Sequence, residues 1–302
     1  MRAVGIVEPG GPEVLRVVDR AVRDAGPGEV RIAVRAAAVN PTDIVLRELG
    51  AEGLEPPWIP GMDAAGIVES VGDGVERFAV GDVVMAAVMP RRPEGGAQAE
   101  LIVVPAASVV PIPDGATLQQ AATLPMNGLT ALLGLELLGL AAEQTLAVSG
   151  GAGLLASYVI PLAKLRGLRV IADAKPEDEA LVRSFGADLV VPRGAGFPAA
   201  AADGFYDTAL LGRSAFPAIR DGGGIAVVRG WNDGEPERSI EIHQVRVATV
   251  LERTDWLLEL RELASEGKLA LRVAAEYPPE EAAEAQRVMA AGGLRGRNVI
   301  VF

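Results

Sequence analysis

The chain has 302 residues, 40 acidic and 28 basic, so its formal net charge is −12. Because this surplus repels nucleic acids and acidic membrane surfaces on average, neither is expected as a partner. There is no cysteine and only one histidine, His243, which excludes disulfides, thiolate zinc sites, a cysteine nucleophile and a histidine metal cluster. Half of the residues are hydrophobic and the length exceeds what one core usually supports, so we expect two folded domains.

Neither a targeting signal nor a membrane span is evident in the sequence. The first residues, Met1 to Gly11, have no basic start and no apolar core of about seven residues. No later run reaches the roughly 18 consecutive apolar residues of a membrane helix. We therefore expect a cytoplasmic protein.

The first part of the chain is rich in short strands punctuated by Gly and Pro. Predicted strands lie within residues 2–11, 29–39, 64–72, 81–88 and 99–113. This pattern is typical of a β-rich module.

From Thr117 the pattern changes to helix, and after residue 140 strands alternate with helices or short connections. The predicted strands are 146–148, 170–172, 188–192, 205–211 and 223–230. Such alternation predicts a doubly wound parallel sheet. An alternating segment, Ser239–Val247, is expected to add a further strand, and the chain then ends as helix, strand, helix and strand.

The stretch from Thr145 to Ala174 has the order of a dinucleotide-binding βαβ unit. Gly151, Gly153 and Ala156 fit G-x-G-x-x-G/A, which provides a tight turn, a close backbone approach to a pyrophosphate and close helix packing. Asp173 lies 22 residues after Gly151, where an acid can contact a ribose hydroxyl. An ordinary glycine-rich turn is the alternative.

Several further segments, in this order and spacing, resemble the medium-chain dehydrogenase/reductase superfamily in its zinc-free quinone oxidoreductase (zeta-crystallin-like) and enoyl reductase branch. They are Asn40–Asp43 with Arg47, Pro60–Gly66, Val71–Val84, Gly95–Glu100, Leu124–Ala131, Gly186–Asp188 and Gly293–Arg297. The resemblance implies an α/β protein with two domains. One is a GroES-like, β-rich domain of residues 1–115 and 258–302, and the other is a Rossmann domain, a doubly wound parallel sheet of residues 116–257.

The resemblance also bears on metal chemistry. Zinc alcohol dehydrogenases of this superfamily use a Cys and a Gly-His-Glu ligand motif, whereas Met62 and Asp63 stand at the latter position here. We therefore expect no metal. An α,β-unsaturated carbonyl or a quinone suits such a site, because conjugation delocalises the charge that hydride addition creates.

The resemblance places a nicotinamide near Asn40, Asp43 and Thr130, the candidate catalytic residues. Asn40 and Thr130 would orient the ring and donate to the substrate carbonyl, and Arg47 is a candidate anchor. The alternatives are structural: an Asn-Pro-x-Asp sequence is a good turn by itself, and Asp43 could cap a helix.

The candidate cofactor-binding residues are Gly150, Gly151, Gly153, Leu154, Leu155, Asp173, Lys175, Arg193, Gly212 and Arg229. Asp173 favours NADH, because it would bind a free ribose hydroxyl and repel a phosphate. Lys175 and Arg193 favour NADPH, because they could bind its additional phosphate. We expect NADPH, with NADH as the alternative.

Four positions depart from the family pattern. Val45 replaces a frequent Tyr, Leu154 brings a large side chain to the glycine loop, Pro161 falls inside the following helix, and Gln286 replaces a frequent His. We expect an NADPH-dependent, zinc-independent reductase that forms a homodimer through Ser239–Val247. The departures leave open a non-redox cyclase or isomerase that reuses the fold, or an NADP(H)-binding sensor.

Overall fold

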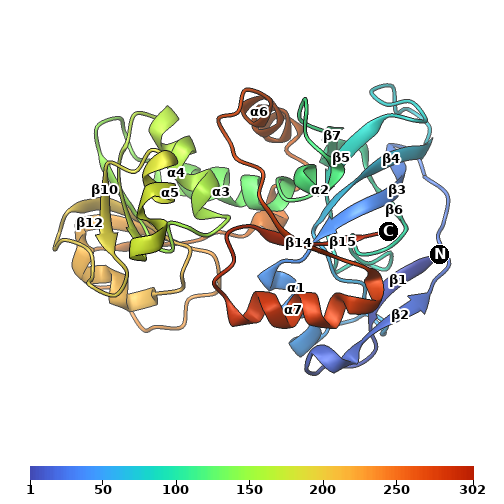
Figure 1. The fold of residues 1–302 in the computed structure, drawn as a ribbon, viewed down its shortest axis with the longest axis horizontal. Coiled ribbons are helices and arrows are strands. Elements are labelled where there is room, and N and C mark those ends of the chain that lie inside the picture. Colours follow the sequence, from blue (N-terminus) through green and yellow to red (C-terminus); the bar gives the residue numbers. More distant parts are fainter. The chain divides into compact units, whose positions relative to one another are not determined.

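The computed structural model describes residues 1–302, and the chain divides into two compact units (Figure 1). The first, here called the β-rich unit, comprises Met1–Met126, Leu251–Gly267 and Leu271–Phe302. The second, the parallel-sheet unit, comprises Asn127–Val250 and Lys268–Ala270. The predicted α/β fold class is confirmed.

The β-rich unit is built on a seven-stranded sheet with the order β14-β15-β3-β4-β5-β7, in which β6 also pairs with β3. All pairs are antiparallel except β14 with β15, and Figure 1 shows β15, from the end of the chain, beside β3, from its beginning. These strands are β3 (Glu29–Ala38), β4 (Asp63–Val71), β5 (Val83–Ala87), β6 (Leu101–Pro105), β7 (Val109–Pro111), β14 (Val273–Tyr277) and β15 (Arg297–Val301). A separate antiparallel pair consists of β1 (Arg2–Ile6) and β2 (Leu15–Asp19).

The helices of the β-rich unit are α1 (Pro41–Leu49), α2 (Leu118–Ala121), α6 (Thr254–Ser265) and α7 (Ala282–Ala291). The start of α1 is specified locally: Asn40 has extended backbone, Pro41 fits the first helical position, and Asp43 completes a capping box with Asn40. Leu46 of α1 and Ala285 of α7 share one apolar cluster with Ile6 of β1. The loop that carries Asn40 is therefore fixed on one side by a cap and on the other by core packing.

The parallel-sheet unit contains six strands in the order β10-β9-β8-β11-β12-β13, and every neighbouring pair is parallel. They are β8 (Thr145–Val148), β9 (Arg169–Ala174), β10 (Leu189–Pro192), β11 (Ala202–Asp207), β12 (Ile219–Val227) and β13 (Glu241–Gln244). The helices α3 (Pro125–Leu138), α4 (Ala156–Leu165) and α5 (Glu179–Ser184) connect or precede them. Strand order reverses between β8 and β11, which is where such sheets bind ligands, beyond their carboxyl ends.

Two local features, the length of β13 and the course of α4, differ from what the sequence pattern predicts. Strand β13 covers only Glu241–Gln244 of the predicted Ser239–Val247, because after Val245 donates to Val227 O at 2.8 Å the chain turns into a short helix over Val247–Thr249. Helix α4 continues through Pro161 to Leu165.

By length and composition alone, Leu118–Leu138 could cross a membrane. However, 78% of its most apolar window is buried inside the protein, as in the core helix of a folded domain.

We predict a homodimer that forms along the outer edge of β13. The Val245 N–H points toward β12. Because successive N–H groups along a strand point in opposite directions, the N–H of the exposed Gln244 points away from the sheet, where a carbonyl oxygen of a second copy could accept its hydrogen bond. Light scattering at micromolar concentration should give twice the chain mass. Gln244→Pro, which removes only this outward donor, should give a monomer, and Gln244→Ala should stay dimeric; a monomeric parent protein would contradict the prediction.

Candidate cofactor-binding and active site

The glycine loop, Ser149–Leu155, joins β8 to α4 and is held in shape by its own backbone. Gly153 N donates to Gly150 O at 2.8 Å, and Gly151 N donates to Asp173 O at 3.1 Å. Gly150 has a φ of +67°, and a Cβ on Gly151 would lie 2.8 Å from that same carbonyl oxygen of Asp173. Glycine is therefore required at position 150 by its positive φ and at position 151 by the close approach of the Asp173 carbonyl oxygen.

At the start of α4 the backbone N–H groups of Leu154 and Leu155 form no hydrogen bond within the chain. They combine with the positive end of the helix dipole, an arrangement that binds phosphate groups. The Leu154 side chain is only 4% exposed, so it packs inward while its N–H stays available. The large side chain that Leu154 brings to the glycine loop therefore lies inside the protein.

Asp173, at the end of β9, connects the glycine loop to Arg193. Its Oδ1 accepts from Gly150 N, and its Oδ2 accepts from Arg193 Nε at 3.1 Å. A Cβ built on Gly150 would lie 3.5 Å from Arg193 Nη2, so the guanidinium lies over the loop. Both Nη groups of Arg193 remain without a partner in the chain, and they are the donors that a phosphate would need.

A pocket of about 510 Å³ lies beside this ion pair, within the size range of cofactor sites. Its apolar part suits a flat ring, and Asp173 and Arg193 supply its charge. It is lined by Asp173, Pro192, Arg193, Gly194, Gly196, Phe197, Ala209, Leu211, Ser214, Ala215, Pro217 and Ala218.

A carboxylate that the sequence analysis did not single out, Asp207, organises the next strand end. It is 2% exposed and accepts from Ser149 Oγ at 2.8 Å, Leu211 N at 3.0 Å and Gly212 N at 2.8 Å. Gly212 has a φ of +55° and shapes this turn. Only the position of Asp207 at a strand end could have signalled its role.

The two remaining basic candidates lie at the surface. Lys175, just beyond β9, has Glu177 at 4.0 Å as its nearest carboxylate, and Arg229, just beyond β12, is exposed. Both are accessible to a ligand, and neither is held in a fixed position by the chain.

Thr130, on α3, is fixed by close packing against β11. Tyr206 donates its hydroxyl to the Thr130 carbonyl oxygen at 2.5 Å. Any side chain at Gly134 would collide with the Tyr206 ring, since a Cβ would come within 2.3 Å of it. Thr130 itself is 6% exposed. Tyr206 and Gly134, which sequence reasoning missed, therefore position this part of α3.

In the β-rich unit, Asn40 and Asp43 belong to a fully buried polar cluster. Asp43 accepts from Asn40 N at 2.8 Å, Gly61 N at 2.9 Å and Gln98 Nε2 at 3.1 Å. Arg297 Nε donates to Asn40 Oδ1 at 2.9 Å. The predicted helix cap at Asp43 is present, and the same carboxylate also ties α1 to the loop before β4.

The cluster contains a second buried carboxylate, Asp63, which follows Met62. Asp63 accepts from Asn40 Nδ2 at 2.6 Å and from Met126 N at 2.5 Å, near the start of α3. Burial raises the pKa of Asp43 to about 6 and that of Asp63 to about 7, although the hydrogen bonds each accepts oppose the shift.

Arg47 serves a structural purpose in the chain's own packing. It is 4% exposed and donates from Nε to Gly10 O at 2.9 Å and from Nη1 to Gln286 Oε1 at 2.7 Å. It therefore links α1 to α7, and Gln286 is its acceptor.

No group of three His, Asp or Glu side chains comes together in a way that could hold a metal ion. At the position where zinc enzymes of the superfamily have a ligand, Met62 is 5% exposed.

Comparison with known proteins agrees with this architecture. Residues 26–114 match the alcohol dehydrogenase GroES-like domain. The chain is 32% identical over 243 residues to a 2-methylene-furan-3-one reductase of Solanum lycopersicum, covering 76% of this chain and 62% of that protein. It is 38% identical over 187 residues to a quinone oxidoreductase of Pseudomonas aeruginosa, covering 59% of this chain and 54% of that protein. The chain thus matches less than two thirds of the length of either relative.

Solved structures match over the full length. An NAD-dependent alcohol dehydrogenase is 30% identical with a TM-score of 0.85, and 100% of both chains is covered. A mycobacterial protein solved in complex with NADPH is 26% identical with a TM-score of 0.86, again with 100% of both chains covered. The chain belongs to the medium-chain dehydrogenase/reductase family of oxidoreductases, in its quinone oxidoreductase branch. The predicted family is confirmed.

The buried carboxyls predict how stability depends on pH. Since folding raises the pKa of Asp43 and Asp63 above the ordinary value of 3.8, the folded state binds more protons between about pH 4 and pH 7. The free energy of unfolding should therefore fall as pH rises through this window, by up to about 1.4 kcal/mol per pH unit for each carboxyl.

Urea unfolding at several pH values measures this slope. Asp63→Asn should flatten the slope, because an amide does not titrate in this window. Asp221→Asn, at an exposed ion pair with Arg238, is the control and should leave the slope unchanged. A slope that is the same in the parent protein and in Asp63→Asn would refute the assignment of this pH dependence to Asp63.

Proposed function

We propose that the protein is an NADPH-dependent, zinc-independent reductase of quinones or α,β-unsaturated carbonyls. One observation carries the proposal: the N–H groups of Leu154 and Leu155 at the start of α4 have no partner in the chain, and Arg193, which lines a pocket, extends over the same glycine loop. A pyrophosphate fits the first feature and an additional phosphate fits the second.

The preference for NADPH over NADH rests on how Asp173 is engaged. Both of its oxygens already accept hydrogen bonds, from Gly150 N and Arg193 Nε. Asp173 therefore connects the glycine loop to Arg193, and we call these two contacts the Asp173 latch. Arg193 keeps two Nη groups for a phosphate, and Lys175, exposed just beyond β9, is the second candidate to bind it. The dinucleotide would be held by the loop, by Arg193 and by the turn that Asp207 shapes.

When bound, NADPH supplies a hydride to the β-carbon of a conjugated acceptor. The negative charge that develops on the acceptor oxygen needs hydrogen-bond donors, and we assign the Thr130 hydroxyl to this role. Asn40 is engaged at both ends of its amide, and we assign it to positioning the loop between β3 and α1. Because Val45 replaces the frequent Tyr, the proton for the α-carbon comes from solvent.

The proposed substrate class agrees with the names of the relatives. One is named for reducing a methylene-furanone, an enone, and another for quinones. Both acceptors delocalise the charge of an added hydride without a metal.

We predict transfer of hydride without a metal requirement. The purified protein should oxidise NADPH in the presence of a quinone or an exocyclic enone, and deuterium from NADPH labelled at C4 should appear at the β-carbon of the enone product by mass spectrometry. Chelators should not alter the rate. Deuterium that fails to appear in any product, or activity lost together with stoichiometric zinc, would contradict the proposal.

We also predict which residue selects the cofactor. Arg193→Ala should weaken NADPH binding at least about tenfold, since a charge-assisted phosphate contact is lost, and change NADH binding by less than about twofold. Arg183→Ala, which removes a comparable exposed ion pair on α5, is the matched control and should change neither. Dissociation constants measured by calorimetry test this prediction. An unchanged NADPH affinity in Arg193→Ala would contradict the assignment of Arg193 to the additional phosphate.

A further inference from the structure

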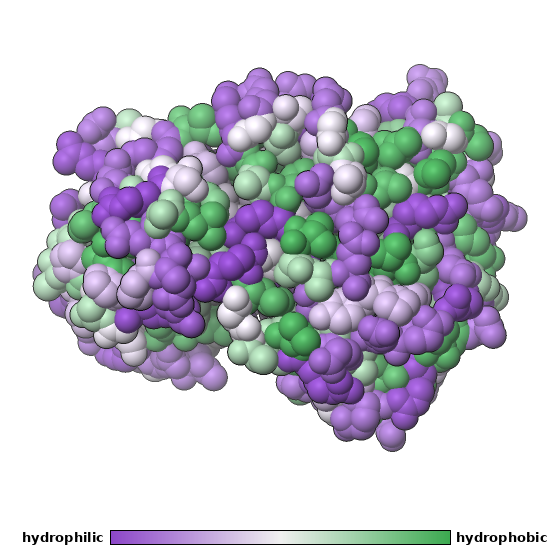
Figure 2. All heavy atoms as spheres, in the orientation of Figure 1, coloured by the Kyte–Doolittle hydropathy of each residue, from purple (hydrophilic) through white to green (hydrophobic).

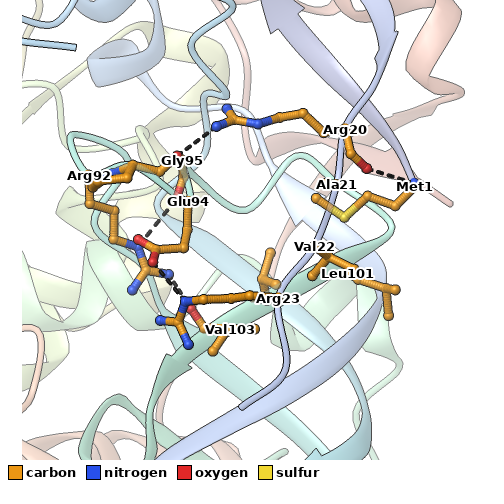
Figure 3. Close-up of a pocket in the computed structure, with 12 residues that line it drawn as sticks. Met1, Arg20, Ala21, Val22, Arg23, Arg92, Glu94, Gly95, Leu101 and Val103 are labelled. Carbon is orange, nitrogen blue, oxygen red and sulfur yellow. Dashed lines mark hydrogen bonds and ion pairs between the residues drawn. The ribbon is translucent and has the colours of Figure 1, made fainter. Parts of the chain in front are cut away.

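The β-rich unit contains a second pocket, of about 300 Å³, which Figure 3 shows in close-up. Its walls come from the segment after β2, the loop before β6 and β6 itself, over residues 20–23, 92–95 and 101–103. None of the residues that we assign to the cofactor or to the acceptor lines it.

The charges around this pocket do not balance. Three arginines, Arg20, Arg23 and Arg92, line it, and only Arg23 forms ion pairs: with Glu29 at 2.5 Å and with Glu94 at 2.9 Å. Together with the Met1 ammonium group, which also lines the pocket, these guanidinium groups give four positive charges, and they face three carboxylates, because Glu252 lies near Arg92 in addition to Glu29 and Glu94. One positive charge is left over, in a chain whose overall net charge is −12.

The unbalanced charge is best assigned to Arg92. Arg20 donates from both Nη groups, to Pro57 O at 3.1 Å and Pro93 O at 2.6 Å. Arg92 donates from Nη2 to Val103 O at 2.5 Å and from Nε to Gly95 O at 3.4 Å, its Nη1 forms no hydrogen bond, and it forms no ion pair with the carboxylates near it. Burial lowers its pKa, and the nearby charge of Arg23 acts in the same direction, while Glu94, Glu29 and Glu252 oppose the shift. A half-buried cation with a free donor is stabilised when an anion pairs with it.

The remaining wall is apolar. Val22, Leu101 and Val103 line the pocket near the guanidinium groups of Arg23 and Arg92, which Figure 3 shows close to the Glu94 carboxylate. A volume of about 300 Å³ is at the small end of the range for ligand sites. The pocket thus offers one positive charge beside an apolar wall.

We propose that this pocket binds a small amphipathic monocarboxylate, whose carboxylate pairs with Arg92 and whose hydrocarbon chain packs against Val22 and Leu101. The site is separate from the proposed reductase site and does not depend on its function.

Calorimetric titration of the full-length protein with octanoate tests the proposal. Octanoate should bind at least about tenfold more tightly than 1-octanol, which has the same chain without the charge. Arg92→Gln should weaken octanoate binding at least about tenfold and leave octanol binding unchanged. Arg16→Gln is the matched control, because Arg16 also donates only to backbone carbonyls, those of Glu13 and Leu15.

A second variant keeps the charge and removes the space. Ala21→Trp should fill the pocket and abolish octanoate binding, while circular dichroism and NADPH binding stay as in the parent protein. The proposal is overturned if the parent binds octanoate no better than octanol, or if both pocket variants bind octanoate as the parent does.

Discussion

The carboxylate of Asp173 holds together the end of the parallel sheet at which the proposed cofactor site lies. It accepts one hydrogen bond from the glycine loop after β8 and one from Arg193, which follows β10, while it sits itself at the end of β9. One side chain thus fixes the relative positions of three strand ends. This carboxylate therefore helps to position both the glycine loop, whose free N–H groups we propose bind phosphate, and the guanidinium of Arg193.

Buried carboxylates serve the same purpose elsewhere in the chain. Asp207 shapes the turn after β11 in the parallel-sheet unit, and Asp43 and Asp63 fix the loop around Asn40 in the β-rich unit. Backbone N–H groups are the donors in most of these contacts, because loops leave such groups without partners and burial makes an unpaired donor costly. Burial of the carboxylates has a cost of its own, which raises the pKa of Asp43 and Asp63.

Much of this arrangement could be predicted from the sequence, because the decisive signals are local. The glycine loop, the strand and helix periods and the cap at Asn40 depend on residues within a few positions of one another. The contact of Arg297 with Asn40 spans 257 residues, and nothing in the spacing of either segment indicates it. The inward rotation of the Leu154 side chain and the free Nη1 of Arg92 depend on three-dimensional packing, which no pattern of residue types specifies.

The central claim is that the Asp173 latch, the glycine loop and Arg193 together form a binding site for NADPH. Calorimetric titration of the purified protein with NADPH tests this claim most directly. We predict saturable binding of one NADPH per chain, with NADH bound more weakly. Absence of measurable binding of either nucleotide would contradict the account.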